Sequence, residues 1–184
     1  MEAVQATHPT VILAEDEASL YLQATLEAVW ALQGQTPIVR VAAGRTKTNF
    51  YGTLNLLTGQ ELALRADHLN AETSAAHLEQ ILSAYPNGSI LLFWDRAPWH
   101  HGAPIRRVLE ANPRLELISL PVAAPALNPQ EHVWKATRRA VSHNHDQARL
   151  PTLADRFEQH LKTTRFPSSF LDRYGYNCIR PMFT

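Results

Sequence analysis

The stretch that decides the fold runs from Ser89 to Arg139. It begins with the apolar run Ile90-Leu91-Leu92-Phe93-Trp94, which ends on Asp95. A helical pattern and a second apolar run, Leu115 to Leu120, precede Pro125-Ala126-Leu127-Asn128-Pro129-Gln130-Glu131-His132-Val133-Trp134. This order predicts a buried strand that carries Asp95 at its carboxyl end, then a helix, a strand and a further helix with Glu131 in its first turn. Two acids brought together in this way are typical of a divalent-metal site.

Length and composition describe one domain that spans residues 1–184. The chain has 45% apolar and 18% charged residues and a formal net charge of +0, so a core is expected, and overall charge does not argue for nucleic acid. Its one cysteine excludes an internal disulfide and a multi-cysteine zinc site. Apolar runs fall short of the ~20 residues of a membrane span, and the start lacks the pattern of a secretion signal. A cytoplasmic protein is expected.

A third acid is predicted near the amino terminus. The β-branched apolar run Thr10 to Ala14 stops on Glu15-Asp16-Glu17, which indicates a central strand with acids at its carboxyl end. Strand alternation places Asp16 on one face of the sheet and Glu15 and Glu17 on the other.

The remaining patterns complete a mixed sheet with helices on its faces. Further strands are expected at 38–42, 49–57, 60–66 and 115–120, and helices at 18–30, 70–85, 104–111, 128–141 and 152–163. Residues 44–48 form a basic loop, and residues 166–184 are expected to cover the core. Ligands of such sheets bind beyond the carboxyl ends of the central strands, where Asp16 and Asp95 belong.

Three acids of this kind suit phosphoryl transfer by two metal ions. That chemistry needs acidic oxygens that hold both ions ~3.5–4 Å apart, which a single acid cannot do. The candidates are Asp16, Asp95 and Glu131. About 35 residues separate Asp95 from Glu131, enough for a helix, a strand and the start of a second helix.

The quoted residues resemble the catalytic domain of the DDE transposases of the mariner superfamily, including its bacterial insertion-sequence branch. The matching motifs are Asp16-Glu17, Asp95-Arg96-Ala97-Pro98-Trp99-His100, the segment from Leu120 to Trp134 that contains Asn128-Pro129-Gln130-Glu131, and Trp30-Ala31-Leu32-Gln33-Gly34. The resemblance extends from Val11 to about Leu161.

The resemblance implies both fold and function. The fold would be an RNase H-like α/β domain, with a mixed five-stranded sheet of three antiparallel and then two parallel strands. Asp16, Asp95 and Glu131 would be catalytic and would ligate two Mg²⁺ ions, with Mn²⁺ as a substitute. Activated water would cut DNA at a transposon end, and the resulting 3′ hydroxyl would attack target DNA. A homodimer acting on paired ends is also implied.

Three departures from the family pattern leave alternatives open, one of which is Ala123-Ala124 in place of the family's Tyr-Ser or similar pair before Pro125. Arg96 stands where the family has Asn, which would place a cation beside the metals. The family's amino-terminal helix-turn-helix region has no counterpart, because the first acid is already at position 16. The chain is then a lone catalytic domain, one part of a split reading frame with a separate end-recognition domain or subunit, or a remnant. The alternatives in function are a non-catalytic DNA-binding or assembly module and another RNase H-like nuclease.

Several other residues have both a functional and a structural interpretation. Asn128, Pro129 and Glu131 also form a helix start with a capping box, and Glu17 is either a helper of Asp16 or a surface acid. His100 is expected beside the site, whereas the scattered histidines do not have zinc spacing. The candidates for contacts with DNA phosphates, which could equally be solvated charges, are Arg45, Lys47, Lys135 and Arg138. Trp94, Trp99 and Trp134 are expected in the core.

Overall fold

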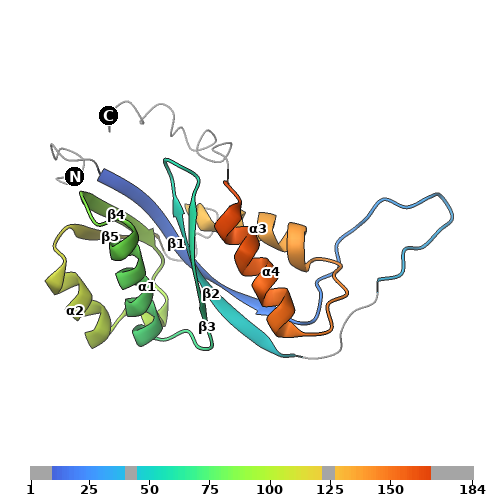
Figure 1. Ribbon diagram of the computed structural model, residues 1–184, viewed down its shortest axis with the longest axis horizontal. Coiled ribbons are helices and arrows are strands. Elements are labelled where there is room, and N and C mark those ends of the chain that lie inside the picture. Colours follow the sequence, from blue (N-terminus) through green and yellow to red (C-terminus); the bar gives the residue numbers. More distant parts are fainter. Residues whose placement is uncertain (1–9, 40–44, 122–126, 167–184) are drawn as a thin grey trace.

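The computed structural model describes residues 10–39, 45–121 and 127–166. Its centre is a five-stranded sheet in the order β3-β2-β1-β4-β5 (Figure 1). The strands are β1 (Thr10–Tyr21), β2 (Lys47–Asn55), β3 (Glu61–Ala66), β4 (Ser89–Trp94) and β5 (Leu115–Ser119). The first three pair antiparallel, and β4 and β5 run parallel to β1. The predicted five-stranded mixed sheet is therefore confirmed.

Helices cover both faces of this sheet. On one side lie α1 (Ala71–Ala84) and α2 (Ala103–Ala111), and on the other lie α3 (Gln130–Thr137) and α4 (Leu150–Thr163) (Figure 1). The predicted start of α1 is confirmed, since the Asn70 side chain accepts the backbone N–H of Thr73 in a reciprocal capping box. A short 3₁₀ turn (Pro98–His100) follows β4, and a π-helical turn (Arg138–Ser142) continues α3.

The alternation of β1 divides the interior into two cores. Ile12, Ala14, Ala18 and Leu20 pack with α3 and α4, whereas Leu13 packs with α1, α2 and β4. Because neighbouring side chains of a strand point to opposite faces, Asp16 belongs to the α3–α4 side. Glu15 and Glu17 belong to the α1–α2 side, as predicted.

Two predictions about the first half of the chain are wrong. β1 does not stop at the acids but continues to Tyr21, so Asp16 lies within the strand, opposite Gly52 of β2. The expected helix 18–30 is therefore absent. Its first residues remain in β1 because Ala18 and Leu20 are buried in the α3–α4 core. Its remainder belongs to a segment that extends away from the sheet, where Trp30 is fully exposed (Figure 1).

Other predicted boundaries also change. No strand forms at Ile38 and Val39, and residues 40–42 of that expected strand lie outside the described residues. The segment from 167 to 184 is likewise outside them. The predicted capping box of Asn128 and Glu131 is absent: α3 begins at Gln130, and Asn128 Oδ1 accepts the Gln130 backbone N–H at 3.1 Å.

Gly52 makes room for α3 against the sheet. It lies directly opposite Asp16, and a Cβ at this position would collide with three side chains of the α3 side and of β3. These are Gln130, Glu61 and Trp134, the last two at 2.5 Å. The absence of a side chain at Gly52 therefore lets the indole ring of Trp134 lie against β2.

Gly52→Ala is expected to destabilise the protein by about 1–3 kcal/mol, because a new methyl group would overpack this contact. Urea denaturation followed by circular dichroism measures the effect. An ordinary strand glycine gains stability when replaced by alanine. An unfolding free energy equal to or above that of the wild type would therefore contradict the close packing of Trp134 on Gly52.

Candidate active site

Asp16 lies at the centre of the acidic constellation. It occupies the middle of β1 on the α3–α4 side, and its Oδ2 accepts a hydrogen bond from Trp134 Nε1 at 3.1 Å. Burial and the nearby carboxylates of Glu131, Glu17 and Asp95 raise the pKa of Asp16 to about 7. Carboxylates from two other motifs are thus close enough to oppose the ionisation of Asp16.

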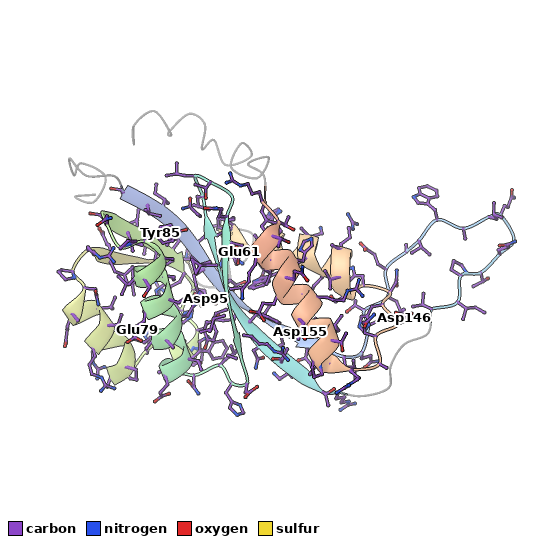
Figure 2. The ribbon with its side chains drawn as sticks, in the orientation of Figure 1. Glu61, Glu79, Tyr85, Asp95, Asp146 and Asp155 are labelled. Carbon is purple, nitrogen blue, oxygen red and sulfur yellow. The ribbon has the colours of Figure 1, made fainter. Side chains whose placement is uncertain are left out.

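Asp95 is held at the carboxyl end of β4. Because Leu13 and Ala14 pair with Leu92 and Phe93 in the parallel register, Asp95 emerges beside the acidic part of β1. Its Oδ1 accepts the backbone N–H of Ala97 at 2.8 Å and lies 3.1 Å from His100 Nδ1. The side chain remains 49% exposed, near the middle of the molecule (Figure 2). One edge of Asp95 is fixed by the turn, and the other faces solvent.

Glu131 comes from the first turn of α3. Its side chain is exposed, and its charge acts on Asp16. The approach to this helix is anchored to β1 by Asn128, whose Nδ2 donates to the backbone carbonyl of Glu15 at 2.9 Å. Asn128 thereby helps to place Glu131 near Asp16.

On the opposite face of β1 lies a buried cluster of Glu15, Glu17 and His100. His100 Nε2 is 2.8 Å from Glu17 Oε1 and 3.6 Å from Glu15 Oε2, and Trp99 Nε1 donates to Glu17 at 2.6 Å. Burial raises the pKa of Glu15 well above its ordinary value, and both of its oxygens lack a hydrogen-bond partner among the described residues. Although burial lowers it, the hydrogen bond to Glu17 raises the pKa of His100.

This cluster has the donor types of a metal site, two carboxylates and an imidazole. Its ligand atoms all lie within 4.8 Å of one another. The internal balance of charge provides another explanation for its composition. Burial favours the protonated form of Glu15, and Glu17 has the His100 ring and the Trp99 indole N–H as partners. Glu17 is therefore a buried partner of His100 and not a surface acid.

A basic pocket adjoins Glu131. It has a volume of about 440 Å³ and is lined by Glu131, His132, Lys135, Arg138 and His143. Lys135 and Arg138, two of the predicted DNA-contact residues, therefore lie beside one of the acids. Arg45 and Lys47 are exposed near the carboxyl end of β1. There Lys47 pairs with Tyr21, and its Nζ lies 5.9 Å from the centroid of the Tyr21 ring. Arg96 is exposed.

Sequence reasoning missed several residues that shape the site. Glu15 was regarded only as a rival of Asp16, and Trp134 only as part of the core. Trp134 is indeed buried, as is Trp94, but Trp99 is only partly so. The sequence did hold a signal for Trp134. It follows Glu131 by three residues, so the two side chains lie one turn apart on the same face of a helix. Gly52 gave no such signal.

Comparison with known proteins identifies relatives of this chain. Residues 11–154 match a family described as DDE superfamily endonuclease. A protein from Shigella sonnei, described as "Insertion element IS630 uncharacterized 39 kDa protein", is 24% identical over 164 residues. That alignment covers 89% of this chain and 47% of the relative, so the chain spans about half the length of the curated protein that it matches.

Solved structures show the same fold. The Mos1 mariner paired-end complex with Mn matches with a TM-score of 0.65 and 16% identity, over 94% of this chain and 56% of that one. The catalytic domain of Mos1 mariner transposase matches with a TM-score of 0.59 and 14% identity, over 83% and 70% of the two chains. The expected RNase H-like architecture is thereby confirmed.

The helices in the described part of the chain are too short or too polar to span a membrane.

Replacing Asp16 by asparagine is expected to stabilise the metal-free protein at neutral pH. The folded-state pKa of about 7 exceeds the ordinary value of 3.8, so the folded state binds more protons between these values and wild-type stability falls as pH rises through this window. The difference in unfolding free energy between Asp16→Asn and wild type should grow from pH 4 and level off above pH 7, at on the order of 4 kcal/mol.

Urea denaturation with EDTA at pH 4, 5.5 and 8 measures this difference. Glu116→Gln, which removes an exposed acid of β5, is the matched control and should show no such dependence. A constant difference between Asp16→Asn and wild type at all three pH values would contradict the electrostatic origin.

Proposed function

The chain belongs to the DDE superfamily endonucleases, and from this membership we propose that it is the catalytic domain of a transposase. It would cut DNA strands and join them to a target by in-line phosphoryl transfer. The observation that carries the proposal is the position of Asp16 beside other acids: burial first, and then the charges of Glu131, Glu17 and Asp95, raise the pKa of Asp16 to about 7. A divalent cation among these groups would remove their repulsion.

The side chains around Asp16 fit such a cation. Carboxylate oxygens are the ligands that Mg²⁺ and Mn²⁺ prefer. Asp16, Asp95 and Glu131 would hold two Mg²⁺ ions, for which Mn²⁺ would substitute. Asp95 and Glu131 reach solvent, so a DNA phosphate can approach them. When bound, the ions would supply Lewis-acid activation of the attacking oxygen and stabilisation of the leaving oxygen.

The protein would position the reactants for two successive displacements. In the first, a water oxygen bonds to phosphorus and the bond to the 3′ oxygen breaks, which leaves a 3′ hydroxyl. In the second, the oxygen of that hydroxyl bonds to a phosphorus of the target strand, the bond from this phosphorus to its own 3′ oxygen breaks, and the expelled oxygen takes up a proton as a new 3′ hydroxyl of the target. Asn128 would support this geometry by fixing the start of α3 to β1, and His100 by its contact with Asp95.

DNA would lie across the basic pocket next to Glu131. Lys135 and Arg138 would contact phosphates there, and Arg45 and Lys47 would extend the contact along the end of β1 and β2. The partners would be transposon ends, target DNA and a second copy of the chain. End recognition would come from a further domain or subunit. The alternative is a non-catalytic DNA-binding or assembly module.

Single replacement of Asp95 by asparagine, or of Glu131 by glutamine, is expected to reduce metal-dependent DNA cleavage by at least about a thousandfold, since each removes one acid of a unit. Nicking of supercoiled plasmid with Mn²⁺ measures this loss. Asp155→Asn is the control and should cleave as wild type does, because this acid is 72% exposed on α4. Equal cleavage by Asp95→Asn and wild type would refute the proposed site. Binding of DNA without any cleavage by wild type would favour the non-catalytic alternative.

Lys135→Ala and Arg138→Ala are each expected to weaken duplex binding and to reduce the slope of log K against log salt by about 0.9, because each would remove one phosphate contact. Fluorescence anisotropy with a short DNA duplex at several salt concentrations measures the slope. Lys162→Ala provides the matched control, since this lysine lies on α4 in an ion pair with Glu158. Unchanged slopes in both variants would place the DNA elsewhere.

A further inference from the structure

The hydrogen bond between Trp134 and Asp16 links the core to the site. Trp134 is 1% exposed, and an indole N–H can only donate. A buried donor needs an acceptor, and this one finds Asp16 Oδ2 at 3.1 Å. The carboxylate of Asp16 is consequently oriented by a group that neither titrates nor moves freely.

The ring of Trp134 is fixed on two sides. Gly52 lies opposite Asp16, and its missing Cβ gives the space into which Trp134 Cη2 fits. On its other side the ring stacks with Phe157 of α4, with centroids 6.3 Å apart and planes inclined by 16°. This packing determines the direction in which the indole N–H points.

The same hydrogen bond also holds α3 in position against β1. Trp134 lies one helical turn after Glu131, and the Asn128 side chain bonds the backbone carbonyl of Glu15. Two side chains of the α3 region are thus joined to consecutive residues of β1. A shift of α3 would break both bonds and would move Glu131 relative to Asp16.

We propose that Trp134 is a positioning residue of the site, whose indole N–H fixes the Asp16 carboxylate and the separation of Asp16 from Glu131. This role rests on the proposed function, since the arrangement that it fixes is the one that would bind metal. Trp134 does not touch the reacting atoms. It acts through Asp16, from the far side of that carboxylate.

Replacing Trp134 by phenylalanine removes the N–H and keeps an aromatic ring. Because loss of a group that orients a metal ligand weakens metal binding, we expect the Kd for Mn²⁺ to rise roughly tenfold in isothermal titration calorimetry without DNA. Leu161→Ala is the matched control: Leu161 of α4 is fully buried in the same core, so its truncation loosens that core but keeps the N–H and the stacked Phe157 ring. It should lower the melting temperature but leave the Kd for Mn²⁺ unchanged. A Kd in Trp134→Phe that equals that of wild type or that of Leu161→Ala would overturn the proposal.

A second measurement does not depend on the folding of Trp134→Phe. In protein labelled with ¹⁵N-tryptophan, four indole resonances are expected, one for each tryptophan. The Trp134 resonance, recognised by the ring-current change in Phe157→Leu, should shift on addition of Mg²⁺ to wild type and stay in place in Asp16→Asn. A resonance that Mg²⁺ leaves unmoved in wild type would overturn the inference.

The two proposals fail separately. Unimpaired plasmid nicking by Asp95→Asn would refute the proposed function, whatever the indole resonances do. A nicking activity that depends on all three acids, together with a wild-type Kd in Trp134→Phe, would retain the function and refute the role of Trp134.

Discussion

The structure depends on how it accommodates carboxylates in the middle of its central strand. Glu15, Asp16 and Glu17 are consecutive in β1, between two other strands, and the buried Glu61 of β3 lies nearby. A buried carboxylate is costly unless it gains a proton, hydrogen bonds or an opposite charge. The elements that pack on both faces of β1 supply different combinations of these, and the combination decides where chemistry is possible.

The two faces of β1 are neutralised in different ways. On the α1–α2 side, burial favours the protonated form of Glu15, and His100 compensates Glu17. On the α3–α4 side, Asp16 accepts hydrogen bonds from the Trp134 indole N–H and from the Glu17 backbone and faces further acids, with no cation paired to it among the described residues. The divalent cation that we propose would therefore act on the α3–α4 face. The strained charge distribution of that face is the kind of local conflict that stability alone does not explain.

The sequence was informative where local pattern and tertiary structure agree. The apolar run before Asp95 ends where β4 ends, and the capping residue and apolar stripe of α1 appear as expected. The extension of β1 beyond its acids was not predictable in this way. Polar residues after Ala14 read locally as the end of a strand, whereas pairing with β2 continues through Tyr21 and overrides that preference. Likewise, contacts between Trp134 and Gly52 depend on a register that no local pattern records.

Glu131 separates a structural from a functional explanation of the acids. Trp134 hydrogen-bonds to Asp16, and His100 contacts Glu17. The positions of both side chains are therefore explained by the buried carboxylates of β1, which need polar partners. The position of Glu131 is not explained in this way. It is exposed, its side chain makes no hydrogen bond within the described part of the chain, and its charge makes the ionisation of Asp16 more difficult. The divalent cation that we propose would give this exposed acid a partner of opposite charge and would remove its repulsion of Asp16.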